Sequence, residues 1–452
     1  MEVQLFLLQL LVLLVASRLL GEVFRKLHQP AVVGELLAGV VLGPSLLGLV
    51  APGVHESLFP PEPGRLLPST LEHFAALGVT LTMLAAGLEV DFPLLRRNTK
   101  ATIWCAVTGT VLPLAIGTGA GFLFPSFWGA PAGHPPFVFA LFLGINLAMS
   151  ALPVIAKTLL DLGIYRTKIG LVILSSAAVD DLGVWILFSF LLALTGGPAE
   201  GGMGPLQSVL YSVAMLVGVS TMGRWAVDRL LPACQSRLPW PGGLVSFTVS
   251  AGLALAWLAM EIGIHPVFGS LLAGVVIGNS PSLRPGGKEV ICDFVLSVFA
   301  PIFFATIGLR MDLRNDFDLP IVSWTLFLGC LSKLVGASAG ARAAGMAWRE
   351  SLAVGVGLNS RGIMGIVLGI VAFEHGLIGR PLFIAIAILS IFTSMISGPL
   401  LRLVLREERI AGADGVEDAA VGGGEAGGPI EGESTRPAGS RAGNPERREG
   451  NQ

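Results

Sequence analysis

Two adjacent aspartates interrupt the stretch KIGLVILSSAAVDDLGVWILFSFLLALT (residues 168–195) at Asp180 and Asp181. The stretch is apolar on both sides of the pair and has about the length that an α-helix needs to cross a bilayer. One carboxylate at that depth costs several kcal/mol, and a second beside it costs more. Binding of protons or metal cations would offset this cost, so the pair predicts a cation site inside a membrane helix.

The composition excludes most soluble classes. Of the 452 residues, 53% are hydrophobic and 13% charged, whereas soluble domains carry about 25% charged residues. A net charge of -2 provides no basic field for nucleic acid. The four cysteines lack the spacing of metal ligands or disulfides. The apolar N-terminal run begins with Glu2 instead of a basic leader, and we interpret it as a retained first span.

Apolar runs separated by Pro, Gly and charges predict an all-α polytopic membrane protein with about 13 transmembrane helices. The predicted spans are 3–21, 30–49, 70–90, 100–124, 135–160, 168–195, 206–230, 243–262, 264–279, 290–309, 319–344, 350–375 and 380–404. Basic residues mostly follow the odd-numbered spans, as at Arg25 and Lys26 or Arg342 and Arg349. Because basic loops stay in the cytoplasm, we expect the N-terminus outside and the C-terminus inside.

Two regions differ sharply in composition. Residues 1–406 contain all the predicted spans, and we expect them to form one transmembrane domain. Residues 407–452 are rich in Gly, Glu and Arg and poor in apolar residues, which predicts a disordered cytoplasmic tail.

The chain repeats itself weakly. LLAGVVLG (36–43) recurs as LLAGVVIG (271–278), and GLEVDF (87–92) recurs as GLRMDL (308–313), in the same order. An odd number of predicted crossings separates the copies, so they have opposite orientations, as in the inverted repeats of secondary transporters. The alternative is that such strings recur because membrane helices are rich in Leu, Ala and Gly.

The fifth and twelfth predicted spans correspond in this repeat, and both are interrupted. In the fifth span, Pro153 frees backbone carbonyls near Asn146 and Ser150. The interruption of the twelfth span contains Asn359, Ser360 and Arg361. Irregular backbone at this depth needs protein or a water-filled cavity around it, so we expect two crossed discontinuous helices whose ends face ions. Each break alone could also be a kink for packing.

Adjacent residues on a helix point about 100° apart, so the two aspartates cannot share one partner. We expect one to line a cavity and the other to pair with Lys333, inside the eleventh span. A carboxylate holds a proton or a cation but not both, and this competition produces exchange. Oxygen atoms of Asp181, Ser150, Asn146 and the freed carbonyls would suit Na⁺, Li⁺ or K⁺.

Several further residues are secondary candidates. Extending the repeat through Gly163 and Gly376 places Asp180 and Asp181 opposite Thr393 and Ser394, which suggests one ion site and not two. Arg361 is expected to offset the carbonyl dipoles of a helix end or to act as a structural anchor. The remaining secondary candidates are Glu35, in a structural or vestibular place, and Ser176.

At these residues the chain resembles the monovalent cation:proton antiporters, most of all the branch with bacterial sodium/proton antiporters and glutathione-gated potassium efflux proteins. The stretches that carry the resemblance are QPAVVGELLAGVVLGPSLLG (29–48), LGVTLTMLAAGLEVDF (77–92), SALPVIAKTLLDLG (150–163), AAVDDLGVWIL (177–187), GIHPVFGSLLAGVVIG (263–278), APIFFATIGLRMDL (300–313) and SKLVGA (332–337).

The resemblance implies a core subdomain interleaved with a dimerisation subdomain, elevator-like alternating access and a homodimer. It implies that Asp181 binds the ion and that Asp180 pairs with Lys333 and releases it on proton binding. A paired aspartate is the pattern of electrogenic relatives. Two departures stand out: Ser150 replaces a frequent Thr, and Ile363 follows Arg361-Gly362 where many relatives have Glu.

We therefore expect an antiporter, active in pH homeostasis, that moves protons and monovalent cations (Na⁺ or K⁺) across the cell membrane without a cofactor. One rival is sodium-coupled symport of an organic anion on a related fold. Enzymatic activity is not expected, because an intramembrane aspartyl protease needs acids that face each other across a water, normally from different helices.

Overall fold

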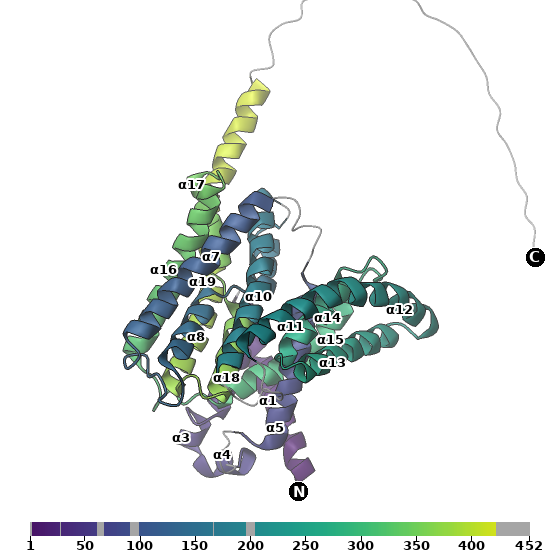
Figure 1. Ribbon diagram of the computed structural model, residues 1–452, viewed down its shortest axis with the longest axis vertical. Helices are drawn as coiled ribbons and strands as arrows, with labels where there is room; N and C mark the ends of the chain where they lie inside the picture. Colours follow the sequence, from purple (N-terminus) through teal and green to yellow (C-terminus); the bar gives the residue numbers. More distant parts are fainter. Residues whose placement is uncertain are drawn as a thin grey trace, which may run out of the picture. The chain divides into compact units, whose positions relative to one another are not determined.

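The computed structural model describes residues 2–27, 29–60, 67–90, 99–165, 167–195 and 204–421, and every regular element in these ranges is a helix (Figure 1). The helices are α1 (Glu2–Lys26), α2 (Ala31–Leu42), α3 (Leu47–Val50), α4 (Pro52–Leu58), α5 (Ser69–Leu88), α7 (Thr99–Leu123), α8 (Pro136–Ala148), α9 (Leu152–Asp161), α10 (Lys168–Leu194), α11 (Pro205–Gly218), the π-helical η1 (Val219–Gly223), α12 (Arg224–Arg237), α13 (Gly242–Glu261), α14 (Pro266–Gly278), α15 (Gly287–Leu309), α16 (Leu319–Ala343), α17 (Trp348–Leu358), α18 (Gly362–Glu374) and α19 (Arg380–Val421).

The chain divides into two units, Met1–Leu405 and Arg406–Gln452, and the membrane helices belong to the first. Residues 407–421, which begin the segment predicted to be disordered, continue α19 as a helix. The rest of that segment, residues 422–452, lies outside the described residues.

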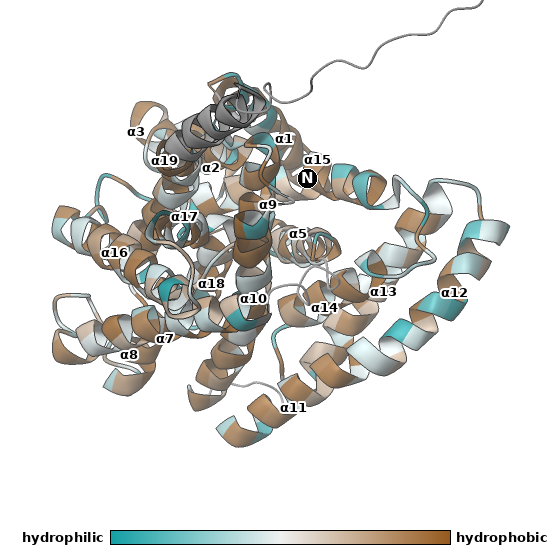
Figure 2. Ribbon diagram, turned by 90° about the horizontal axis from the view of Figure 1, so that it is seen from above, coloured by the Kyte–Doolittle hydropathy of each residue, from teal (hydrophilic) through white to brown (hydrophobic). Residues whose placement is uncertain are grey.

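Membrane-length helices dominate the first unit. The described residues include 11 helices long and apolar enough to cross a membrane, with two shorter apolar helices at Pro266–Gly278 and Met364–Glu374. Large apolar side chains point outward, such as Leu206 (81% exposed) and Met222 (76%). Figure 2 shows that most helices, α12 apart, are coloured mainly as hydrophobic. Such a surface suits lipid. The all-helical polytopic fold is confirmed, while the number of 13 spans stays a prediction.

The helices of this unit fall into two groups. The core group is α7–α10 with α16–α19, and the scaffold group is α1, α2, α5 and α13–α15. The most extensive helix packing lies within each group, as between α7 and α16 or between α5 and α14. Figures 1 and 2 show α7, α8 and α16 on one side and α13, α14 and α15 on the other. The run α11–η1–α12 connects them, because α11 packs on α10 and α12 on α13.

The repeat seen in the sequence appears in the packing of the scaffold group. A Cβ atom on Gly39 (α2) would collide with the Ala305 carbonyl of α15. A Cβ atom on Gly274 (α14) would likewise collide with the Leu84 carbonyl of α5. Gly39 and Gly274 hold the same place in the two LLAG strings. Each copy therefore packs a glycine-bearing helix, backbone against backbone, on a helix of the other copy.

Replacing Gly274 with alanine is expected to destabilise the protein by about 1–3 kcal/mol, because the added methyl group meets backbone that cannot rotate away. Thermal unfolding in detergent, followed by size-exclusion chromatography, measures the effect as a lower melting temperature. Gly218→Ala is the control, since open space surrounds this glycine in α11 and alanine favours a helix. Equal melting temperatures for the two variants would contradict the argument.

Candidate functional site

The two predicted breaks lie side by side. α8 ends at Ala148 and α9 begins at Leu152, while α17 ends at Leu358 and α18 begins at Gly362. The N–H of Ala151 donates to the carbonyl of Ser360 across a distance of 2.8 Å, which joins the two breaks directly.

Local sequence explains both restarts. Pro153 lies in the first turn of α9, where its missing N–H removes no helical hydrogen bond. Gly362 has a φ of +52°, a value that glycine adopts readily. The crossed discontinuous helices expected from the sequence are therefore present.

Two basic side chains cap the end of α8. The guanidinium of Arg361 donates to the carbonyls of Asn146, Leu147, Met149 and Gly329 at 2.8, 2.6, 3.3 and 2.7 Å. Lys333 Nζ lies 2.5 Å from the Ala148 carbonyl. Both side chains are fully buried. Positive charge at a helix C-terminus satisfies its carbonyls and opposes its dipole.

This capping differs from part of the sequence-based expectation. We expected the freed carbonyls near Asn146 to be open to a cation, and the structure gives them to Arg361 and Lys333 instead. The reason is physical, since a buried helix end needs donors whether or not an ion is bound.

Both carboxylate oxygens of Asp180 have partners. Its Oδ2 lies 2.7 Å from Lys333 Nζ and 3.1 Å from Ser150 Oγ, and its Oδ1 accepts a hydrogen bond of 2.6 Å from Thr110. The side chains of Asp180 and Lys333 are both 0% exposed. The Ser150 hydroxyl therefore bonds to Asp180, and it also lies 3.0 Å from the Leu358 carbonyl. This aspartate is held as a paired charge within the core group.

Asp181 is held much more loosely. The N–H of Leu152, in the first turn of α9, lies 3.4 Å from its Oδ2, so the positive end of that half-helix points at the carboxylate. Its Oδ1 is buried and has no hydrogen-bond partner among the described residues. An oxygen in this state costs free energy unless a proton or a cation binds it.

Hydroxyl groups occupy the corresponding place in the second copy. The N–H of Gly362, at the start of α18, donates to Ser394 Oγ at 3.0 Å, and the N–H of Arg361 lies 3.4 Å from Thr393 Oγ1. Thus a half-helix start faces α19 hydroxyls in one copy and the carboxylate of Asp181 in the other. A neutral hydroxyl neither titrates near neutral pH nor carries charge.

The other candidate residues from the sequence contact different parts of the fold. Asn146 Nδ2 donates to the Gly365 carbonyl at 3.2 Å, and Ser176 Oγ donates to the Thr102 carbonyl of α7 at 3.2 Å. Glu35 is buried on α2, and its side chain is close to Gly21 of α1 in the scaffold group. The side-chain oxygens without a hydrogen-bond partner among the described residues include those of Asn146, Asn359 and Ser360.

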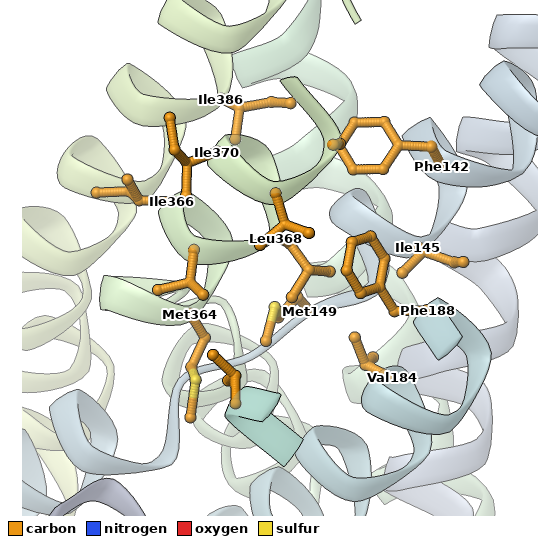
Figure 3. Packing of buried hydrophobic residues seen from close by; sticks show 14 of the residues in the cluster. Phe142, Ile145, Met149, Val184, Phe188, Met364, Ile366, Leu368, Ile370 and Ile386 are labelled. Carbon is orange, nitrogen blue, oxygen red and sulfur yellow. The ribbon is translucent and has the colours of Figure 1, made fainter. Parts of the chain in front are cut away.

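Apolar side chains surround the breaks. Figure 3 shows Phe142 and Ile145 of α8 near Phe188 of α10 and Leu368 of α18, all members of the largest buried cluster. A cavity of about 30 Å³ approaches from the scaffold group, with Glu89 and Thr82 on its wall. It also touches Ala151 and Pro153, the neighbours of Leu152. The surrounding apolar packing lowers the local dielectric, which strengthens charge interactions at the pair.

Comparisons with known proteins point to one family of membrane proteins. Residues 10–407 match the family described as "Sodium/hydrogen exchanger, transmembrane". Na(+)/H(+) antiporter NhaS4 of Synechocystis sp. is 29% identical over 399 residues, which cover 88% of this chain and 96% of that protein. Na(+)/H(+)-K(+) antiporter GerN of Bacillus cereus is 28% identical over 403 residues, covering 88% and 95%.

Some relatives are longer. Cation/H(+) antiporter 18 of Arabidopsis thaliana is 29% identical over 420 residues, 90% of this chain but 50% of that protein, so the chain spans about half its length. The structure of the sodium proton antiporter MjNhaP1 from Methanocaldococcus jannaschii superposes with a TM-score of 0.65 at 14% identity, over 90% of this chain and 98% of that one. That likeness shows a shared fold. Since the family match extends over residues 10–407, the chain belongs to the transmembrane sodium/hydrogen exchanger family.

Proposed function

We propose that this multi-pass membrane protein is a secondary antiporter that exchanges protons for monovalent cations, Na⁺ or K⁺, by alternating access. One observation carries the proposal: Asp181 is buried at the crossing of two broken helices and keeps an oxygen without a hydrogen-bond partner among the described residues. A proton or a small cation satisfies that oxygen, and each excludes the other. Binding of one therefore drives release of the other.

Asp180 and Lys333 form a separate charge pair in this proposal. With both aspartates and the lysine ionised, the site carries one net negative charge. The 2.7 Å contact breaks when Asp180 takes up a proton, which frees Lys333 to change its own partner. When the pair gains and loses a proton in the same cycle as Asp181, more protons than cations cross and the exchange is electrogenic.

The location and the assembly of the protein are also proposals. We propose the cell membrane, the N-terminus outside, the C-terminus in the cytoplasm and a homodimer within the lipid bilayer, supported by the basic loops and by the family resemblance. The protein acts as a carrier and not as an enzyme. The rival prediction, symport of an organic anion, has no support among the relatives, which are named as cation/proton antiporters.

Purified protein in proteoliposomes tests the proposal. With an acidic interior and a pH-sensitive dye inside, addition of NaCl or KCl is expected to dissipate the pH gradient, whereas choline chloride is not. An imposed membrane potential should change the rate if exchange is electrogenic. No cation-dependent proton movement with Na⁺, K⁺ or Li⁺ would overturn the proposal.

A further inference from the structure

We propose that Arg310 and Glu374 form a latch that holds the scaffold and core groups together at one end of the molecule, and that the residues at the equivalent positions of the other end do not form one. Its part in the transport cycle rests on the proposed antiport, because alternating access requires the two groups to change their relative position. The latch itself rests on ion pairs and on the two copies of the repeat.

Arg310 crosses between the groups. It directly follows α15 of the scaffold group, and its Nη1 lies 2.7 Å from Oε1 of Glu374, the last residue of α18 in the core group. Its Nη2 lies 3.8 Å from Oε1 of Glu72 on α5, within the scaffold group. The side chain of Arg310 is only 6% exposed and that of Glu374 is 48% exposed, so water screens the pair from the glutamate side only. One guanidinium thus joins an internal partner and a partner across the boundary.

The latch borders a cavity of about 120 Å³ between the groups. Thr80, His265 and Arg310 line the cavity from the scaffold group, and Val371 and Glu374 line it from α18. A cavity of this volume has room for several water molecules. A movement that separates α15 from α18 would widen this cavity and must first break the ion pair.

Among the described residues of the first copy, the equivalent positions do not form an ion pair. Arg310 follows α15 as Glu89 follows α5, at the same place in GLRMDL and GLEVDF. Glu374 ends α18 as Asp161 ends α9, each two residues before the glycine that aligns the copies. The residues at the equivalent positions, Glu89 and Asp161, are both acidic and cannot form an ion pair. Glu89 lines the 30 Å³ cavity beside the break of α8 and α9.

The two ends therefore differ in the ion pair that these equivalent positions can form. An arginine and a glutamate attract each other at one end, while two acids stand at the corresponding positions of the other. Such a difference favours the arrangement in which the Arg310 end is closed, and it shifts the balance between two conformations without contact with the transported ion. In the proposed orientation, the latched end faces the outside.

Cysteine labelling of the full chain in nanodiscs tests the latch. Thr80 and Thr82 of α5 are similarly buried, at 7% and 2% exposure, but Thr80 lines the latch cavity and Thr82 the opposite one. Each is replaced by cysteine after the four native cysteines are changed to alanine. Adding Glu374→Gln should raise the labelling rate of Thr80→Cys by a charged thiol reagent about tenfold, which corresponds to ~1.4 kcal/mol. The rate at Thr82→Cys should not rise.

Glu72→Gln is the matched control. It removes a second carboxylate near Arg310, but Glu72 and Arg310 both belong to the scaffold group. Labelling of Thr80→Cys should therefore stay within about twofold of the parent, a change of ~0.4 kcal/mol. The latch is refuted if Glu374→Gln leaves the rate unchanged, if Glu72→Gln raises it equally, or if Thr82→Cys accelerates in parallel. Labelling needs no transported ion. A clear response in a protein without exchange in proteoliposomes would therefore refute antiport and leave the latch intact.

Discussion

Replacing Asp181 with asparagine is expected to abolish cation-dependent proton movement in proteoliposomes. Asparagine keeps the shape of the side chain and can still accept from the N–H of Leu152, but it neither titrates nor attracts a cation. The rate should fall by at least about a hundredfold, the loss expected when a step depends on ~3 kcal/mol of interaction that no longer forms. The assay is the dye measurement with NaCl and KCl described above.

A measurement of thermal stability separates the loss of transport from misfolding. The Asp181→Asn variant carries no charge at this buried position, so its melting temperature should equal or exceed that of the parent protein, because the desolvation cost of a carboxylate is gone. Asp293→Asn is the control for activity, since Asp293 is an exposed residue on α15 and its variant should keep full exchange. Exchange that persists in the Asp181→Asn variant would remove Asp181 from the mechanism.

Replacing Lys333 with methionine is expected to cost about 3–5 kcal/mol of stability, because Asp180 then stays buried without its cation. Lys333 is also a donor to the Ala148 carbonyl at the end of α8, so the half-helix loses one of its two basic caps. Thermal unfolding in detergent should show a melting temperature lower by several degrees. The length of methionine preserves most of the packing, which leaves charge as the main change.

The double variant Asp180→Asn with Lys333→Met identifies the cause. With both charges removed, most of the lost stability should return, since a buried ion pair is often close to neutral relative to uncharged groups of similar size. The coupling between the two changes in a double-mutant cycle should reach at least ~2 kcal/mol. Additive effects would show that Lys333 acts through packing and not through Asp180.

The helix breaks could be predicted from the sequence, because the residues that cause them act locally. Pro153 suits the first turn of a helix better than its interior, and the Asn359–Gly362 segment contains weak helix formers. A lysine in an apolar span requires an acid nearby. The repeated glycines were equally visible in the sequence, because two main chains can approach closely only where a residue lacks a Cβ atom.

Other contacts depend on how helices are rotated against each other. Thr110 on α7 donates to Asp180, and nothing in the sequence around Thr110 distinguishes it from other membrane threonines. Ser150 was expected near Asp181 and lies near Asp180, since a rotation of one residue on a helix exchanges such neighbours. The capping of α8 by Arg361 joins residues more than 200 positions apart and requires the fold itself.

The glycine contacts of the scaffold group have a mechanical consequence. Where α2 meets α15 and α5 meets α14, main chains touch without side chains between them, so there is no soft layer that could shear. Closely packed interfaces shift as wholes and do not bend gradually. We therefore expect the four helices to move as one rigid unit, with displacement at the boundary between this unit and the core group and at the π-helical η1 that connects the groups.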